Sequence, residues 1–328
     1  MTRTIKGMFS AFVSEANPED PISALQFGDQ PEPEVPAGWA RVQVKAAALN
    51  HHDLWSLKGV GLPAERMPMI LGTDAAGIDD DGNEVLVHGV IASAGHYGDE
   101  SFDAKRTLLS EIHQGAMAEY VVVPQQNLVA KPAEISFEEA ACLPTAWLTA
   151  YRMLTRDSGL KPGDTVLIQG ASGGVSTACI AIGRQMGLRV WVTGRSQDKC
   201  DAAIELGAHE AFESGARLPG KADAVIDSVG EATWAHSMRS LRPGGTIVTC
   251  GATSGPNPKA DLNRMFFFQL NIVGSMMGNR TELEQVVALC RNTGIRPPIA
   301  QVLPLADATP AFAAMNAGET AGKFVFTL

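Results

Sequence analysis

The chain has 328 residues, and at roughly 150 residues per domain this length predicts about two domains. Its 36 acidic and 26 basic residues give a formal net charge of −10, which argues against nucleic acid or an anionic membrane as a partner, because both require a basic face. No apolar stretch reaches the roughly 18 residues that a membrane helix needs, and no signal peptide is visible. The five cysteines lie far apart without a CxxC pair, so we expect buried thiols in a reducing cytoplasm.

The first 130 or so residues are expected to be rich in β-structure. Residues 39–46 alternate between apolar and polar side chains, which is the period of a half-buried strand. Residues 84–88 and 118–123 predict further strands, and Pro124 ends the second of these. Prolines and glycines separate the strands, and residues 79–83 are most simply a turn.

From about Ser136 the pattern changes to alternating strands and helices. Ser136 and Glu139 have the spacing of a capping box, so we expect a helix from Phe137 that Pro144 bends or restarts. Strands are then expected at 165–169, 189–193, 222–227, 245–250 and 323–328, and helices at 175–186, 198–206, 234–241 and 281–291. The alternation in the middle of the chain predicts a parallel sheet with right-handed crossovers.

The strongest local motif is the glycine-rich turn Gly170-Ala-Ser-Gly-Gly-Val-Ser176, which follows one predicted strand and opens a helix. Such a turn lets the backbone approach a pyrophosphate, and the helix N-terminus offers N–H groups and a partial positive charge. Ser176 stands where a third glycine normally allows close packing, but serine is small. Strand, turn, helix and second strand follow in order, which favours dinucleotide binding over an ordinary turn. We expect the cofactor phosphates to contact Ala171, Ser172, Gly173, Gly174 and Val175.

The end of the second strand discriminates between cofactors. An NAD enzyme usually has Asp or Glu about 20 residues beyond the glycines, where the carboxylate accepts hydrogen bonds from the ribose. Gly194 occupies that place here, and Arg195, Ser196 and Lys199 follow it in positions that suit an additional phosphate. The alternative is a solvated basic loop before a helix. The sequence therefore predicts NADPH rather than NADH.

Short motifs along nearly the whole chain carry a family resemblance. They are residues 48–53, 71–77, 115–124, 143–150, the glycine turn, and 322–326. Each motif is degenerate, but in this order and spacing they resemble the medium-chain dehydrogenase/reductase superfamily, and more narrowly its zinc-free, quinone-oxidoreductase-like branch. The resemblance implies an α/β fold in which a Rossmann doubly wound parallel-sheet domain, residues 131–278, is inserted in a GroES-like β-barrel catalytic domain, residues 1–130 and 279–328. It also implies a homodimer.

Metal-dependent members of this superfamily hold a catalytic zinc ion at three positions that align with Asn50, Thr73 and Thr145. None of these side chains is a good zinc ligand, since zinc prefers thiolate, imidazole or carboxylate. Residues 92–116 contain no cysteine, so the four-cysteine structural lobe of the metal-dependent members has no counterpart. We expect no metal.

Without a metal, hydride transfer favours an acceptor that delocalises the incoming charge itself. By the resemblance, Asn50 is the expected catalytic hydrogen-bond donor; a turn asparagine bonded to its own backbone is the alternative. Asp53 is expected to orient the site or relay a proton, with a purely structural role as its alternative. Further residues are expected around the nicotinamide and its ribose: Thr145, Thr149, Gly251, Ala252, Met276 and Met277.

Together these features predict a zinc-independent, NADPH-dependent oxidoreductase that transfers hydride to a quinone or an α,β-unsaturated carbonyl compound. An enoyl-thioester reductase and a zinc-free alcohol dehydrogenase-like enzyme are the alternatives of the same class. The absence of an obvious basic entrance for coenzyme A phosphate near these motifs disfavours the thioester. An NADPH-binding protein with little turnover is the alternative from another class.

Overall fold

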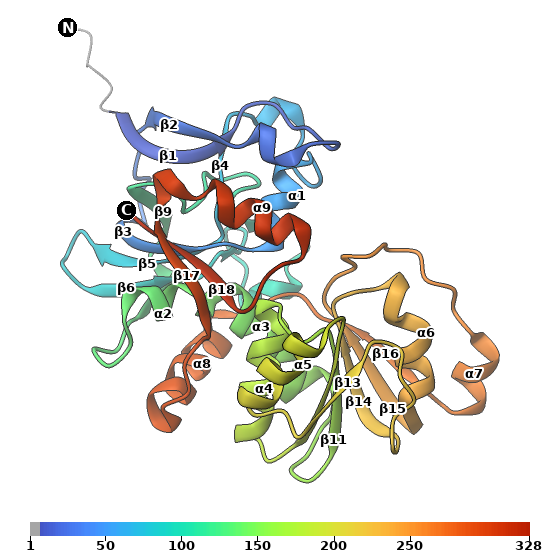
Figure 1. Cartoon of the computed structure of the whole chain (residues 1–328). Coiled ribbons are helices and arrows are strands. Elements are labelled where there is room, and N and C mark those ends of the chain that lie inside the picture. Colours follow the sequence, from blue (N-terminus) through green and yellow to red (C-terminus); the bar gives the residue numbers. More distant parts are fainter. Residues whose placement is uncertain (1–6) are drawn as a thin grey trace, which may run out of the picture. The chain divides into compact units, whose positions relative to one another are not determined.

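The computed structural model describes residues 7–328, which form two compact units. The first unit comprises residues 7–145 and 279–328, and the second comprises residues 146–278 (Figure 1). Among residues 7–328, no helix combines the length and the hydropathy that a membrane span requires.

The first unit is built mainly on antiparallel strands. Its strands are β1 (Gly7–Val13), β2 (Gln26–Pro31), β3 (Trp39–Ala48), β4 (Met69–Ile70), β5 (Asp74–Asp79), β6 (Glu84–Val87), β7 (Val90–Ile91), β8 (Thr107–Leu108), β9 (Tyr120–Pro124), β10 (Leu128–Ala130), β17 (Ile299–Pro304) and β18 (Lys323–Thr327). Its α-helices are α1 (His51–Leu57), α2 (Phe137–Ala141), α8 (Arg280–Thr293) and α9 (Thr309–Ala317). Four of these strands (β3, β6, β9 and β18) and the helices α2 and α8 agree closely with the sequence pattern, whereas β1, β17 and α9 are among the elements that were not predicted.

The large sheet of this unit has the order β10-β6-β5-β3-β18-β17, and β9 also pairs with β3. The C-terminal strand β18 runs antiparallel to β3, with Val325 opposite Ala48. This pairing joins segments from the two ends of the chain, drawn in blue and red in Figure 1, and it brings Lys323 to the end of β3. The unit's core includes the stacked rings of Phe312 and Phe326, whose centroids are 6.0 Å apart.

The capping box predicted at Ser136 is confirmed. The Ser136 Oγ accepts the backbone N–H of Glu139 at 3.2 Å, and the Glu139 carboxylate accepts the backbone N–H of Ser136 at 2.9 Å. The helix changes to a π-helical segment at Leu143–Trp147, in agreement with the expected effect of Pro144, which cannot donate a helical hydrogen bond. Helix α2 packs against β3 and β5 and so belongs to the first unit.

The second unit contains one six-stranded parallel sheet. Its strands are β11 (Thr165–Gln169), β12 (Arg189–Gly194), β13 (Glu210–Glu213), β14 (Ala222–Asp227), β15 (Leu241–Thr249) and β16 (Asn271–Gly274). Its α-helices are α3 (Leu148–Arg152), α4 (Gly174–Gln185), α5 (Gln197–Glu205), α6 (Glu231–Ser240) and α7 (Leu262–Phe267). Side chains on the central strands, such as Leu167, Val225 and Ile247, are fully buried, as expected for a sheet covered on both faces.

The strand order is β13-β12-β11-β14-β15-β16, and every pair is parallel. Numbered from β11, this is the order 3-2-1-4-5-6 of a Rossmann sheet, so the predicted doubly wound fold is confirmed. The polypeptide reverses its winding direction between β11 and β14. In such sheets, ligands bind beyond the carboxyl ends of the strands.

Candidate functional site

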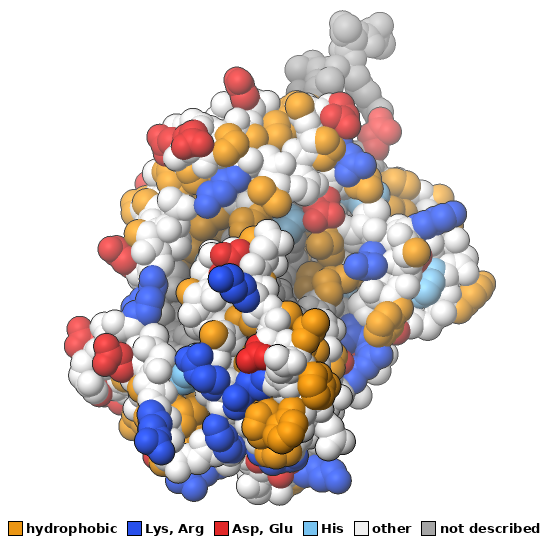
Figure 2. Space-filling view, turned by 90° about the vertical axis from the view of Figure 1, so that its right-hand side faces the viewer, with side chains coloured by type: hydrophobic (Ala, Val, Ile, Leu, Met, Phe, Trp, Pro, Cys, Tyr) orange, Lys and Arg blue, Asp and Glu red, His pale blue; other side chains and the backbone are white. Residues whose placement is uncertain are grey.

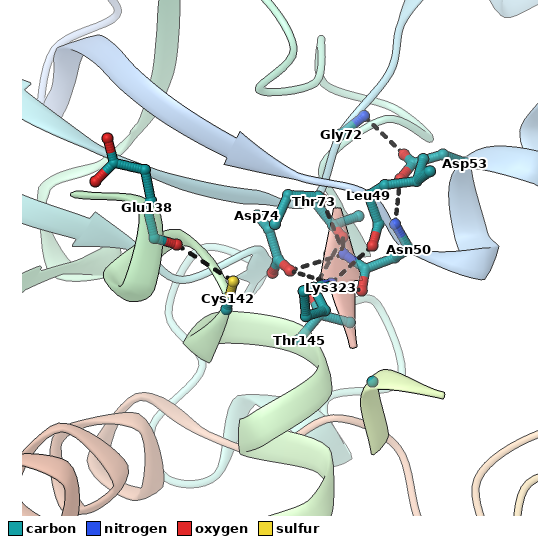
Figure 3. Close-up of polar contacts among 12 residues, drawn as sticks. Leu49, Asn50, Asp53, Gly72, Thr73, Asp74, Glu138, Cys142, Thr145 and Lys323 are labelled. Carbon is teal, nitrogen blue, oxygen red and sulfur yellow. Dashed lines mark hydrogen bonds and ion pairs between the residues drawn. The ribbon is translucent and has the colours of Figure 1, made fainter. Parts of the chain in front are cut away.

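A buried polar cluster lies in the first unit where β3 ends and α1 begins (Figure 3). Asp53, in the first turn of α1, is fully buried, and its Oδ2 accepts the backbone N–H of Asn50 at 2.9 Å. Its Oδ1 accepts the backbone N–H of Gly72 at 2.9 Å. Burial raises the pKa of Asp53, although His52 and the two backbone hydrogen bonds oppose this shift. Asp53 therefore ties the start of α1 to the loop before β5.

The side-chain amide of Asn50 is engaged within the cluster. Its Oδ1 accepts a hydrogen bond from Lys323 Nζ at 2.6 Å, and its Nδ2 donates to Asp74 Oδ2 at 2.8 Å. Nδ2 also lies 3.3 Å from Thr73 Oγ1 and from the backbone carbonyl of Ala48. The cationic donor on one side and the carboxylate on the other fix which end of the amide is oxygen. The N–H groups of Asn50 are thus directed at cluster residues.

Lys323 and Asp74 form a buried ion pair in this cluster, with Lys323 Nζ 3.2 Å from Asp74 Oδ2. The side chains are 3% and 0% exposed. The ammonium also donates to the backbone carbonyl of Leu49 at 2.7 Å, so it has three acceptors for its three N–H groups. Asp74 Oδ1 is buried and has no hydrogen-bond partner among residues 7–328. A buried charge requires such pairing, so this contact joins β5 to the C-terminal strand β18.

Neither Lys323 nor Asp74 was among the predicted site residues. Each is a single charged residue within a motif that is otherwise apolar or small, Leu71-Gly-Thr-Asp-Ala-Ala-Gly77 and Gly322-Lys-Phe-Val-Phe. A lone charge in a segment expected to be buried needs a buried partner of opposite sign. This sequence pattern could have identified Lys323 and Asp74 as a buried pair.

The three positions that align with zinc ligands in the superfamily come together in the structure. Thr73 Oγ1 lies 3.3 Å from Asn50 Nδ2 and 3.1 Å from Thr145 Oγ1. The donor set is one amide and two hydroxyl groups, and the neighbouring carboxylate of Asp74 is paired with Lys323. These residues do not fit a zinc ion, which prefers thiolate, imidazole or unpaired carboxylate ligands. Within residues 7–328, no group of three or more His, Cys, Asp or Glu side chains is placed to hold a metal.

A second polar pair lies one residue before Asp53. His52 Nε2 is 3.1 Å from Glu111 Oε1, and His52 Nδ1 is buried with no partner among the described residues. Burial lowers the pKa of His52, but the hydrogen bond to Glu111 and the nearby Asp53 carboxylate outweigh it, so the pKa lies above its ordinary value. Glu111 was not predicted from the sequence.

In the second unit, the glycine-rich turn joins β11 to α4. Gly170 has a φ of +87°, a conformation that favours glycine. Gly173 is the N-cap of α4, no side chain of the described residues caps the helix, and its first turn contains no acidic residue. A Cβ built at Gly173 would have no described atom within 4 Å. An open helix N-terminus of this kind is a suitable place for a phosphate group. The contacts of Ala171, Ser172, Gly173, Gly174 and Val175 with a cofactor stay a prediction.

The predicted specificity segment begins where β12 ends. Gly194 is buried, whereas Arg195 and Ser196 are exposed and Lys199 is half-buried on α5. Because β11 and β12 are adjacent parallel strands, this segment and the glycine turn lie at the same edge of the sheet.

The carboxyl ends of β15 and β16 are also adjacent, with Thr249 opposite Gly274. Gly251 and Ala252 follow β15. Met276 and Met277 follow β16, and Met277 is buried with a φ of +43°, which is strained for a side chain of this size. Thr149 is buried in α3 of the second unit, and Thr145 belongs to the first.

A buried hydrogen-bond network underlies this edge of the sheet and was not predicted. The hydroxyl of Thr193 donates to Gln169 Oε1 at 2.7 Å, and Gln169 Nε2 donates to His236 Nδ1 at 2.9 Å and to Ser237 Oγ at 3.0 Å. Ser237 in turn donates to Asp227 Oδ2 at 2.6 Å. The network links the carboxyl ends of β11, β12 and β14, and the glycine turn and the specificity segment follow the first two of these strands.

Comparison with known proteins identifies the family. The model of the alcohol dehydrogenase GroES-like domain matches residues 36–133, and the zinc-binding dehydrogenase model matches residues 174–292. A zinc-type alcohol dehydrogenase-like protein of Schizosaccharomyces pombe is 30% identical over 338 residues, which cover 94% of this chain and 97% of the relative. The chain belongs to the medium-chain dehydrogenase/reductase superfamily of oxidoreductases. The predicted superfamily is confirmed.

Other members of this superfamily that are similar to the chain carry different names. A crotonyl-CoA carboxylase/reductase of Cereibacter sphaeroides is 27% identical over 366 residues, covering 92% of this chain and 83% of that protein. The structure of an NAD-dependent alcohol dehydrogenase has a TM-score of 0.90 at 32% identity, over 98% of this chain and 100% of that one. The 2-octenoyl-CoA carboxylase reductase CinF in complex with NADP and 2-octenoyl-CoA has a TM-score of 0.89 at 25% identity, over 98% of this chain and 87% of that one.

Proposed function

We propose that this superfamily member is an NADPH-dependent, zinc-independent reductase of conjugated carbonyl compounds. The observation that carries the proposal is the convergence of Asn50, Thr73 and Thr145, which place an amide and two hydroxyl groups at the positions of a zinc ligand set. A reaction at such a site has to proceed without a Lewis acid, which favours an acceptor that spreads the incoming negative charge over its own conjugated bonds.

The second unit supplies the cofactor site in this proposal. Residues 171–175 bind the pyrophosphate at the N-terminus of α4, which is open in the described structure. Arg195, Ser196 and Lys199 bind the 2′-phosphate, while Gly194 offers no carboxylate for a free ribose hydroxyl. A bound nicotinamide would supply the hydride. We assign its surroundings to Thr145, Thr149, Gly251, Ala252, Met276 and Met277.

The first unit positions the polar groups of the reaction. Lys323 donates to the carbonyl oxygen of the Asn50 amide, which polarises the amide and strengthens its N–H groups as donors. Asn50 thereby holds Thr73 in place, and Asp53 fixes the backbone of Asn50. We therefore assign Asn50 and Asp53 to the catalytic cluster as the residues that orient it.

The names of two relatives favour unsaturated thioesters as the substrate class. Both the Cereibacter protein and CinF are named for reactions on unsaturated CoA thioesters, and the CinF structure contains NADP. A quinone has the same conjugated carbonyl chemistry and is the second candidate.

The test is to follow NADPH oxidation in the presence of crotonyl-CoA, 1,4-benzoquinone, an alkenal and a simple aldehyde in separate reactions. The proposal predicts turnover of conjugated acceptors, with crotonyl-CoA first, and at most slow turnover of the simple aldehyde. Preferred reduction of the simple aldehyde would contradict it. Tight NADPH binding without turnover of any acceptor would favour a binding protein.

We also propose that the chain forms a homodimer through the second unit. β16 is an edge strand that pairs with β15 alone among the described strands, and an edge strand can pair with a copy of itself about a two-fold axis. Beside it, Phe266 and Phe267 on α7 are 70% and 73% exposed. Helix α7 lies at the right of Figure 1 and so faces the viewer in Figure 2, where hydrophobic side chains reach the surface. Light scattering should report a dimer that Phe267→Asp dissociates, whereas Phe102→Asp, at a residue 68% exposed in the first unit, leaves it intact.

The unpaired cysteines are the basis for the cellular compartment that we propose. All five cysteines are free, and burial raises the pKa of Cys142 and Cys250 to about 12, so these side chains stay neutral thiols. Unpaired thiols suit a reducing compartment, and we place the protein in the cytoplasm. A cell fractionation that recovered the protein with periplasmic or secreted markers would refute this placement.

A further inference from the structure

The specificity segment contains a steric contact that the sequence does not reveal. Gly194 has no left-handed backbone conformation, so its φ does not explain the glycine. The explanation is space: a Cβ built at Gly194 would lie 2.6 Å from Cys200 Sγ, closer than a carbon atom and a sulfur atom can pack.

The environment of Cys200 holds the sulfur in this place. Cys200 lies on α5 and is 6% exposed, and its Sγ lies 3.5 Å from the backbone carbonyl of Phe212 on β13, to which the thiol donates. Without the sulfur, the atoms nearest to the added Cβ would be Ala171 Cβ at 3.4 Å and the backbone nitrogen of Cys200 at 3.5 Å. These are ordinary van der Waals distances, so Sγ is the one atom of the three nearest that has to move before position 194 can carry a side chain.

We propose that Cys200 is a specificity-determining residue of the cofactor site, because its sulfur fills the space that a ribose-binding carboxylate at position 194 requires. The inference rests on the proposed cofactor, NADPH, and extends it. An aspartate at position 194 would give the ribose hydroxyls a charged hydrogen-bond acceptor, as in NAD enzymes. The Cys200 sulfur prevents this substitution from producing NADH binding on its own.

Gly194→Asp is made alone and together with Cys200→Ala, and the dissociation constants for NADH and NADPH are measured by nicotinamide fluorescence. We expect Gly194→Asp alone to weaken NADPH binding without improving NADH binding. The double variant should bind NADH roughly tenfold to a hundredfold more tightly than Gly194→Asp, the effect of a charged hydrogen bond. The matched control pairs Gly194→Asp with Cys290→Ala, a fully buried cysteine on α8, and should behave like Gly194→Asp alone. Equal NADH affinity of Gly194→Asp with and without Cys200→Ala would overturn the proposal.

A double-mutant cycle tests the steric contact between position 194 and Cys200 without any cofactor. Gly194→Ala adds only the Cβ atom, and we expect it to lower the Tm by roughly 3–8 °C when Cys200 is present. In the Cys200→Ala background the same change should lower the Tm by less than about 2 °C. Additive Tm effects would refute the steric contact whatever the cofactor is. Equal affinity of the unaltered protein for NADPH and NADH would refute the cofactor preference. It would not affect the steric contact that the Tm measurements test.

Discussion

The buried ion pair of Lys323 and Asp74 allows a sharp test of how the first unit is held together. Lys323→Met keeps most of the side-chain volume and removes the ammonium. The Asp74 carboxylate then stays fully buried, and Asn50 Nδ2 is the one described hydrogen-bond donor left to it. The carbonyl of Leu49 and Oδ1 of Asn50 also lose their donor. Removal of one partner from a buried pair costs about 3–5 kcal/mol, so we expect the free energy of unfolding to fall by that amount.

Urea unfolding followed by tryptophan fluorescence measures this loss. Lys45→Met is the matched control, because Lys45 Nζ makes an exposed hydrogen bond to Gln43, and it should change the free energy of unfolding by less than about 0.5 kcal/mol. Asp74→Asn in the Lys323→Met background removes the uncompensated charge and should recover part of the loss. A loss below about 1 kcal/mol for Lys323→Met would refute the assignment of this pair as a stabilising buried contact between β5 and the C-terminal strand β18.

Three further predictions concern the other polar groups. Arg195→Ala should weaken NADPH binding roughly tenfold to a hundredfold and leave NADH binding unchanged, as measured by fluorescence titration; equal losses for both cofactors would contradict a 2′-phosphate contact. Gln169→Leu leaves Thr193 and His236 without their buried partner and should lower the free energy of unfolding by about 1–3 kcal/mol, whereas Gln43→Leu on the surface should lower it by less than about 0.5 kcal/mol. The raised pKa of His52 means that its pair with Glu111 stabilises the fold fully below the ordinary value of 6.5 and loses this effect as the pH rises through the folded pKa. The stability of the protein relative to His52→Gln should therefore decline as the pH rises above the ordinary pKa of 6.5, and a constant difference would argue against the pair.

The Rossmann sheet and its phosphate-binding turn were predictable because their signals are local. The four strands that were predicted in that unit contain short, mainly apolar runs, and the glycine turn with the following helix lies within one stretch of sequence. The two outer strands, β13 and β16, were not predicted; β13 has the sequence Glu-Ala-Phe-Glu, in which charged residues stand at both ends. Gly194 and Arg195 lie at the same edge of the sheet as the glycine turn because β11 and β12 are adjacent parallel strands. The capping box at Ser136 is equally local, since both partners lie three residues apart.

The buried pairs were not predictable in the same way, because their partners are distant in sequence. Asp74 and Lys323 are 249 residues apart and meet because β5 and β18 both pair with β3. Gln169 and His236 are 67 residues apart and meet through the packing of α6 on the sheet. No local period encodes such a contact. The Gly194–Cys200 contact is close in sequence, yet it depends on the side-chain rotamer of Cys200, which no residue pattern reports.

The central claim is that this superfamily member uses NADPH to reduce a conjugated carbonyl compound without a metal. The most direct measurement is the rate of NADPH oxidation with crotonyl-CoA by protein dialysed against a strong chelator, before and after addition of Zn²⁺. We predict that the chelated protein retains its full rate and that Zn²⁺ does not increase it, because Asn50, Thr73 and Thr145 provide no zinc ligand set. Loss of the activity on chelation and its return with stoichiometric Zn²⁺ would contradict the account.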